Sequence, residues 1–203
     1  MRNYPKIIFN YSWIYDQIYK ENWELKKKKI KPYPSAKKIL NYIKKIEKLW
    51  KKEEKRVMQE IAKIIELKWK LKSIECYVVG RCRPISCPLT MPVYEKRPTF
   101  FIDVLVHELI HTIFTGNDKN TKKAWRYIES KHKKESWTTK NHIVIHAIHS
   151  HIYFKFYGEK RLMRDIGSMS WNPDYKKAWD IVKKEGYKNI VNEFAKRIKN
   201  FKE

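Results

Sequence analysis

The segment spanning residues 99–116, TFFIDVLVHELIHTIFTG, constrains this chain more than any other part of its sequence. It combines an almost wholly apolar helical pattern with two histidines four residues apart, His107 and His111. Residues at this spacing lie on one face of an α-helix, about one turn from each other, so both imidazoles can reach a single metal ion. Glu108 lies beside them, where it can take a proton from a metal-bound water rather than bind the metal itself. The pattern therefore predicts a helix that binds a metal.

The flanks of the motif predict that this helix is buried, from an N-cap at Thr99 to a stop at Gly116. Its apolar residues leave hardly any polar face: Phe100, Phe101, Ile102, Val104, Leu105, Val106, Leu109, Ile110, Ile113 and Phe114. Two histidines and a glutamate in such surroundings are costly to desolvate unless they share a strong partner, and a divalent metal is the obvious one. We therefore expect a zinc ion here, with a structural histidine cluster as the alternative.

The charge of the chain is strongly lopsided. Its 203 residues include 46 Lys and Arg against 22 Asp and Glu, which gives a net charge of +24. Such a surface attracts polyanions, and nucleic acid is the usual one. The alternative is a general surface composition, because a chain rich in Lys and Ile with only five Gly also has the profile of hyperthermophile proteins. Nucleic acid is therefore a possible partner through the basic surface.

Targeting and membrane signals are missing from the sequence. No signal peptide is visible, and the most apolar stretch, residues 100–114, is too short to span a membrane and is interrupted by Asp103. We therefore expect a cytoplasmic protein with no membrane partner. The cysteines, Cys76, Cys82 and Cys87, match no zinc-knuckle spacing. We expect buried thiols, with a disulfide between two of them as the alternative.

Ahead of the motif the sequence predicts mainly helix, first over residues 12–25. Over residues 35–72 the apolar side chains recur mainly at spacings of three and four, or a sum of these, with Trp69 five residues after the last of them: Ile39, Ile43, Ile46, Trp50, Val57, Ile61, Ile64 and Trp69. This pattern predicts one long amphipathic helix packed on the core, or two helices with a joint near Glu53 and Glu54. A coiled-coil dimer is the alternative that the charged segment at residues 51–56 disfavours.

Directly before the motif the pattern changes to short β-prone runs, at residues 76–79 and 89–94. They predict a hairpin or two strands of a small sheet. Pro88 and Pro92 place the second run at a sheet edge or in an extended segment. An extended peptide could add to that edge as a further strand, and a simple capping hairpin is the alternative.

After the motif the sequence predicts a loop and then helices alone. The loop covers residues 117–120, and the helices cover residues 121–134, 138–157, 174–185 and 187–201. Thr138 or Thr139 can cap the second of these helices and Gly158 can end it. The expected fold is α+β, predominantly helical, with a small β-hairpin or sheet packed on the buried helix. We expect a single domain, in which residues 1–72 form a helical N-terminal extension and residues 73–203 the catalytic core.

A catalytic zinc usually takes three protein ligands and leaves a fourth position for water. The helix predicted at residues 138–157 carries His142, His146 and His149 on one face. We favour His146 as the third ligand, because it is central in this row and the following Ala147 permits a close helix approach. His142 and then Glu129 are the alternatives. The histidines that do not bind metal, including His149, would support the ligands or stabilise a developing oxyanion.

The HELIH motif on a buried helix, after a β-prone edge and before a helix with a third ligand, resembles the zincin metallopeptidases. The compact layout is similar to the SprT/Spartan-like and minigluzincin groups of small zincins. The resemblance covers about residues 74–157. It implies a small mixed sheet over an active-site helix, one zinc ion, and hydrolysis of peptide bonds by a zinc-bound water that the glutamate activates. A gluzincin would need a glutamate ligand, which Glu129 matches only approximately, whereas the HIVIHAIH segment favours histidine.

We therefore expect a zinc metalloendopeptidase that acts on a protein or peptide substrate. His107, His111 and His146 would bind Zn²⁺, and Glu108 would be the general base. The edge at residues 89–94 would align the substrate. The alternatives are a basic nucleic-acid-binding protein with a structural zinc site and a regulatory zincin that cleaves one specific partner.

Overall fold

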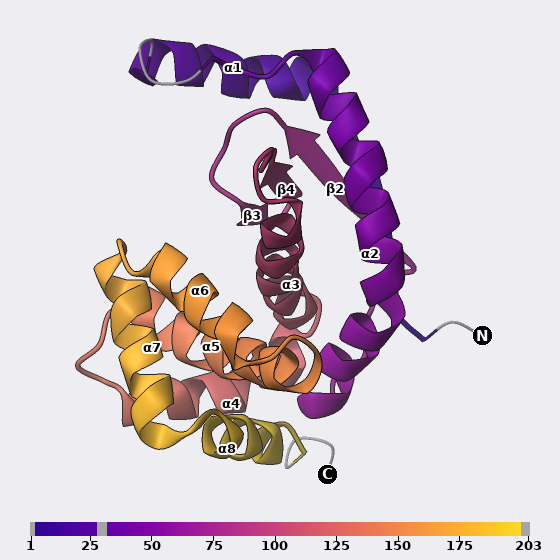
Figure 1. Cartoon of the computed structure of the whole chain (residues 1–203). Helices are drawn as coiled ribbons and strands as arrows, with labels where there is room; N and C mark the ends of the chain where they lie inside the picture. Colours follow the sequence, from indigo (N-terminus) through magenta and orange to yellow (C-terminus); the bar gives the residue numbers. More distant parts are fainter. Residues whose placement is uncertain (1–2, 28–31, 200–203) are drawn as a thin grey trace. The chain divides into compact units, whose positions relative to one another are not determined.

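The computed structural model describes residues 3–27 and 32–199 (Figure 1). Over these residues the chain forms eight helices and four short strands. In chain order they are β1 Lys6–Asn10, α1 Trp13–Lys27, α2 Ala36–Ile64, β2 Ser73–Val79, β3 Ile85–Ser86, β4 Leu89–Pro92, α3 Pro98–Thr115, α4 Asp118–Lys131, α5 Trp137–Phe156, α6 Glu159–Met169, α7 Pro173–Glu185 and α8 Tyr187–Lys199. The predicted α+β class, mostly helical with a small sheet, is confirmed.

The chain divides into two compact units. Unit 1 contains residues 1–55 and 71–112, and unit 2 contains residues 56–70 and 113–203. The chain therefore passes from one unit to the other within α2 and within α3. The predicted boundary after residue 72 lies inside unit 1. There β1 pairs in parallel with β2, so the N-terminal segment supplies a strand of the sheet as well as helices.

The sheet of unit 1 has the strand order β1-β2-β4-β3. The β1–β2 and β2–β4 pairs are parallel, and the β3–β4 pair is antiparallel. The prediction that residues 89–94 form the sheet edge is wrong, because β3 pairs along the outer side of β4. Pro92 is tolerated in this inner strand because it occupies the last paired position, opposite Val79, where a missing N–H interrupts little. The edge is instead Ile85–Ser86.

The helix predicted over residues 35–72 is one continuous helix that ends earlier than expected. It runs through residues 53 and 54 without a break and stops at Ile64. Glu66 then adopts a positive φ of 54°, and Leu67 N donates to Ala62 O at 3.1 Å. This is the hydrogen-bond pattern of a Schellman C-cap. Trp69, predicted to continue the helix, instead donates its Nε1 to the Met58 carbonyl at 3.0 Å.

A buried carboxylate joins the helical and β parts of unit 1. Asp16 of α1, 2% exposed, accepts hydrogen bonds from Tyr33 Oη at 2.5 Å and from Gly80 N at 2.9 Å. The Tyr33 ring covers Gly80 so closely that a Cβ there would lie 2.4 Å from it. Glycine is therefore required at the end of β2, where the backbone passes under the tyrosine.

Unit 2 is built around α5, which packs against α6, α7 and α8. The predicted helices correspond to α4, α5, α7 and α8, although α4 begins at Asp118, inside the predicted loop. Ser136 rather than a threonine caps α5, since its side chain accepts from Thr139 N. The end predicted at Phe201 lies outside the described residues. Helix α6 was not predicted from the sequence, although Leu162, Ile166 and Met169 recur at helical spacing, because it is short and its last turns contain Gly167 and Ser168, which are poor helix formers.

Two further expectations concern membranes and thiols. Within the described residues no single helix has the length and composition to cross a membrane, and α3 with α4 meets that test only as a pair bent by 107°. All three cysteines are free thiols, so no disulfide links them. Only Cys76 is buried as expected, whereas Cys82 is half-buried and Cys87 is exposed.

Candidate metal centre

The HELIH motif lies on α3, in the core. Every residue from 101 to 110 is buried, including His107 at 3% exposure and Glu108 at 9%. The helix begins at Pro98, one residue before the predicted N-cap, because proline fits the first helical position, where its missing N–H has no partner to lose. The apolar pattern therefore places the motif inside the molecule, as predicted.

The two histidines of the motif point their ring nitrogens at each other. His107 Nε2 and His111 Nε2 lie 3.3 Å apart, and the ring centroids are 5.0 Å apart. Two nitrogens bound to one tetrahedral ion at 2.0–2.1 Å are separated by about 3.3–3.4 Å. The separation in α3 therefore matches that of two ligands on the same ion.

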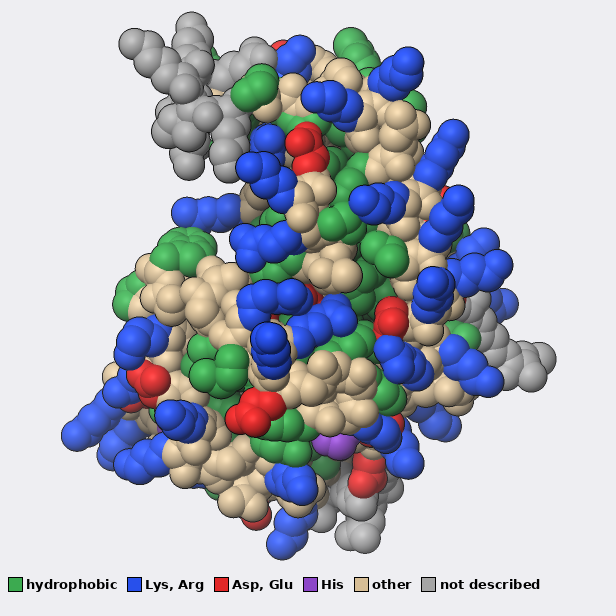
Figure 2. All heavy atoms as spheres, in the orientation of Figure 1, with side chains coloured by type: hydrophobic (Ala, Val, Ile, Leu, Met, Phe, Trp, Pro, Cys, Tyr) green, Lys and Arg blue, Asp and Glu red, His purple; other side chains and the backbone are tan. Residues whose placement is uncertain are grey.

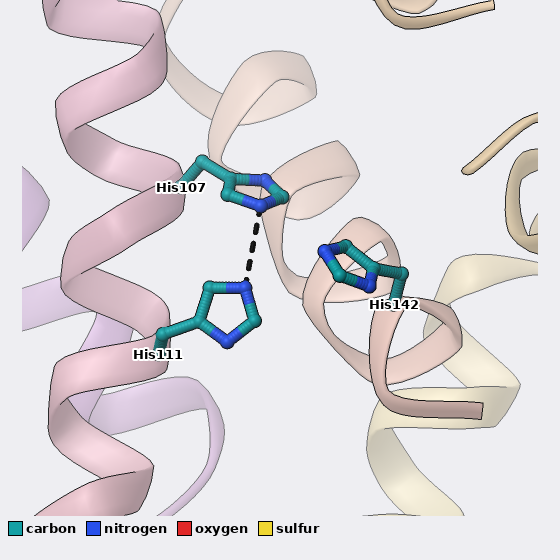
Figure 3. Close-up of side chains that lie close together, drawn as sticks. All are labelled: His107, His111 and His142. Carbon is teal, nitrogen blue, oxygen red and sulfur yellow. Dashed lines mark hydrogen bonds between the residues drawn. The ribbon is translucent and has the colours of Figure 1, made fainter. Parts of the chain in front are cut away.

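A third imidazole joins this pair. Ring nitrogens of His107, His111 and His142 all lie within 4.8 Å of one another (Figure 3). His142 is buried and comes from the second turn of α5. Figure 3 shows the three rings directed toward a common point. These histidines are close enough to hold a metal ion.

The tautomer of His142 is set within α5. His142 Nδ1 lies 2.8 Å from the carbonyl oxygen of Thr138, one turn earlier, so Nδ1 carries the proton and donates it. The Nε2 lone pair is then the ligand atom. Burial lowers the pKa of His142, against the opposing effects of the Thr138 hydrogen bond and the Asp174 charge. A neutral imidazole is the form that binds metals.

The first turn of α7 positions His142. The Tyr175 ring stacks on the His142 ring at a centroid distance of 4.1 Å and an interplanar angle of 30°. Asp174 Oδ1 accepts hydrogen bonds from Ser136 Oγ at 2.5 Å and Thr139 Oγ1 at 2.9 Å. These bonds fix the first turn of α5, which carries the Thr138 carbonyl. Both the ring plane of His142 and the backbone that holds its proton are therefore held by neighbouring residues.

The histidine that we favoured from the sequence, His146, is not in the group of three. Its ring stacks on Trp179 at 4.0 Å with an interplanar angle of only 9°. The third member is instead His142, the alternative one turn earlier. Tyr175 and Trp179 were overlooked in the sequence, although their spacing of four residues repeats the spacing of the histidines on which they stack.

The remaining candidates lie in other surroundings. His149 is buried, with its Nδ1 3.7 Å from Asp165 Oδ2. Glu129 is exposed on α4 and does not belong to the group of three. The thiol of Cys82 does not belong to it either. Burial, followed by the negative charges of Glu108 and Asp16, raises the pKa of Cys82 to about 12, so it remains protonated.

The carboxylate of the motif is held in an apolar environment. Burial raises the pKa of Glu108 to about 7. Thr112 Oγ1 donates to the Glu108 carbonyl oxygen at 2.9 Å and lies 3.4 Å from the carbonyl oxygen of Ser86 in β3. The sheet edge therefore lies against α3 next to His111.

The donor set suits a transition metal. Three imidazoles are typical ligands of zinc, copper, iron and nickel, whereas magnesium and calcium require oxygen ligands. A buried carboxylate next to such a group can move a proton at the site. Comparisons with family models, curated proteins and solved structures gave no match for this chain. Its function must therefore be argued from the site.

Proposed function

We propose that this chain is a zinc-dependent peptidase in which His107, His111 and His142 hold the metal and Glu108 is the general base. The observation that carries the proposal is the approach of three ring nitrogens to within 4.8 Å of one another, with a buried carboxylate next to one of them in the chain. Three histidines leave the fourth position of a tetrahedral zinc open, which is the arrangement of catalytic rather than structural sites. The HELIH motif supports the same proposal, because in this motif the glutamate is adjacent in sequence to a histidine ligand but does not itself bind the metal.

Each residue has a separate task in this reaction. Zinc, when bound, supplies a Lewis acid that polarises a carbonyl and makes water more acidic. Glu108 accepts the proton of the attacking water and returns it to the leaving amine. His142 keeps its Nδ1 proton on the Thr138 carbonyl and so presents the lone pair of Nε2. The surrounding apolar residues of α3 exclude bulk water, which strengthens every charge interaction at Glu108.

The edge of the sheet in unit 1 offers a place for an extended substrate. β3 is the terminal strand, and its Ser86 carbonyl lies 3.4 Å from Thr112 Oγ1, next to His111 on α3. A peptide that pairs with β3 would use main-chain hydrogen bonds, so its side chains would matter less for binding than its extended shape. We therefore expect cleavage within flexible, unstructured segments.

The test is the activity of Glu108→Gln on casein and on an unstructured peptide, with bound zinc measured on the same samples. The variant should keep one zinc per chain and lose activity by about 10²–10⁴-fold, the usual contribution of a general base. Glu129→Gln is the matched control, because it makes the same chemical change at an exposed position of α4. A wild-type chain that binds no zinc, or a Glu108→Gln variant as active as the control, would disprove the proposal.

A further inference from the structure

The outer side of α2 in unit 1 is covered with lysine. Between residues 37 and 55 all the lysines of this helix are exposed: Lys37, Lys38, Lys44, Lys45, Lys48, Lys51, Lys52 and Lys55. An α-helix turns by about 100° per residue. One straight row is therefore formed by Lys37, Lys44, Lys48, Lys51 and Lys55, and a second row beside it by Lys38, Lys45 and Lys52. We call these side chains the lysine face. Figure 2 shows Lys and Arg side chains along the length of this helix.

The orientation of the lysine face is fixed by the opposite side of the helix. Ile39, Ile46 and Trp50 are at most 2% exposed and pack into the core of unit 1. Glu54 Oε1 accepts a hydrogen bond from Ile7 N of β1 at 3.1 Å, which ties the same helix to the sheet. The helix therefore cannot rotate without losing its buried contacts, and the lysines remain directed outward.

The lysine face also carries a cost for the helix itself. Lysines three and four residues apart, such as Lys44 with Lys48 and Lys51 with Lys55, repel each other and weaken an isolated helix. Glu47 only borders the face, and Glu54 is directed to the sheet. A polyanion placed along the face would relieve this repulsion.

We propose that the lysine face of α2 binds the phosphodiester backbone of nucleic acid. At a rise of about 1.5 Å per residue, the row from Lys37 to Lys55 extends over about 27 Å. Successive phosphates of one strand rise by about 3.4 Å along the axis of a duplex, so the row spans an axial length of about eight base pairs. This inference concerns α2 alone and does not depend on the metal centre.

The chemistry of the face favours nucleic acid over an anionic membrane. Helices that lie on membranes insert a continuous apolar side into the acyl region. Here Leu40, 46% exposed, borders the face on one side and the half-buried Leu49 on the other, and the polar Asn41 lies between the two rows. A face of charges on a rigid scaffold, with no apolar stripe to insert, suits a surface of regularly spaced phosphates.

The experiment measures binding of fluorescent 20-nucleotide duplex DNA and single-stranded RNA over a range of salt concentrations. The face variant carries Lys44→Gln, Lys48→Gln, Lys51→Gln and Lys55→Gln. The control variant carries Lys122→Gln, Lys133→Gln, Lys183→Gln and Lys184→Gln, which removes the same charge from exposed positions of unit 2. Melting temperature and circular dichroism confirm that both variants fold.

Wild type should bind duplex DNA with a steep salt dependence. The face variant should lower the slope of log K against log salt by about 3–4, since each lost phosphate contact contributes about 0.9. The control variant should change the slope by less than about 1. Equal losses in both variants would overturn the proposal, because they would assign binding to total charge. Wild type that binds phosphatidylserine vesicles and neither nucleic acid would overturn it in favour of a membrane.

Discussion

Helices α3 and α5 each carry a pair of histidines four residues apart, and the rings of the two pairs contact different neighbours. The ring centroids are 5.0 Å apart for His107 and His111 and 5.3 Å apart for His142 and His146. In α3 the two Nε2 atoms approach to 3.3 Å. In α5 each ring instead stacks on an aromatic side chain of α7, His142 on Tyr175 and His146 on Trp179. The spacing places two histidines on one helix face, but the neighbours of each ring decide where its nitrogens point.

The neighbours also separate the two histidines of α5 from each other. His146 stacks almost parallel on Trp179, at 9°, whereas His142 is tilted by 30° against Tyr175. His142 in addition has its Nδ1 engaged by the Thr138 carbonyl. One histidine of the pair therefore belongs to the group of three that lie close enough to hold a metal ion, and the other is packed as an aromatic ring, although both are buried.

The largest predicted effect should come from replacing one histidine of each pair with alanine. His111→Ala should weaken zinc binding by about a thousandfold, because a site of three ligands cannot spare one and each contributes several kcal/mol. His146→Ala should keep one zinc per chain but reduce the free energy of unfolding by about 2–4 kcal/mol, through loss of its packing on Trp179. Zinc affinity by chelator competition and unfolding by urea measure the two effects.

His142→Ala belongs to the same series and should behave as His111→Ala does. The contrast between His142→Ala and His146→Ala is decisive for the third ligand. If zinc binding is lost in His146→Ala and kept in His142→Ala, the assignment of the two rings is reversed and the comparison between the helices no longer holds.

A smaller effect should follow from removing the ring that supports His142. Tyr175→Ala should weaken zinc binding by about 10–100-fold, the usual range for residues that orient a ligand. Tyr175→Phe should restore it, because the stacked ring remains. Trp179→Phe is the control, since it preserves an aromatic neighbour for His146. Equal zinc affinity in Tyr175→Ala and wild type would show that the stack does not position the ligand.

The α3 half of this comparison could be predicted from the sequence and the α5 half could not. His107, Glu108 and His111 share one helix with their apolar flanks, so local spacing was sufficient to find them. The choice between His142 and His146 depends on Tyr175 and Trp179, which come from another helix about thirty residues later. The position of β4 inside the sheet was missed for a different reason, because the partner that covers it is adjacent in sequence but very short. Its outer partner, β3, has only two residues and carries no alternating pattern.

The smallest predicted effect on stability concerns charged contacts. Charged side chains hold the C-terminal half of α5, whereas α3 is held by apolar burial. Glu60 of α2 accepts hydrogen bonds from His151 Nε2 at 2.7 Å and from Lys155 Nζ at 2.5 Å. Burial alone would raise the pKa of Glu60, but these two hydrogen bonds and the charges of their donors outweigh it, so the pKa lies below its usual range. The Glu60 side chain is 11% exposed, so solvent screens these bonds only in part. The ionised carboxylate therefore stabilises unit 2.

A lowered pKa fixes the direction of the pH effect. The stabilisation is fully present above the pKa of about 4.3 that a glutamate has in the unfolded chain, and it is lost as the pH falls through the lower pKa of the folded state. Glu60→Gln should therefore reduce the free energy of unfolding by about 1.5–3 kcal/mol at pH 7, the range for hydrogen bonds to a charged group. The difference from wild type should shrink steadily below pH of about 4.

Urea unfolding of metal-free protein at several pH values measures this effect, with Glu129→Gln as the exposed control. The metal must be removed, because zinc binding would add its own pH dependence through the histidines. A deficit of Glu60→Gln that stays constant from neutral to acid pH would mean that the residue acts by packing alone. A deficit that disappears in acid would show that the C-terminal half of α5 depends on charge, whereas apolar burial secures α3.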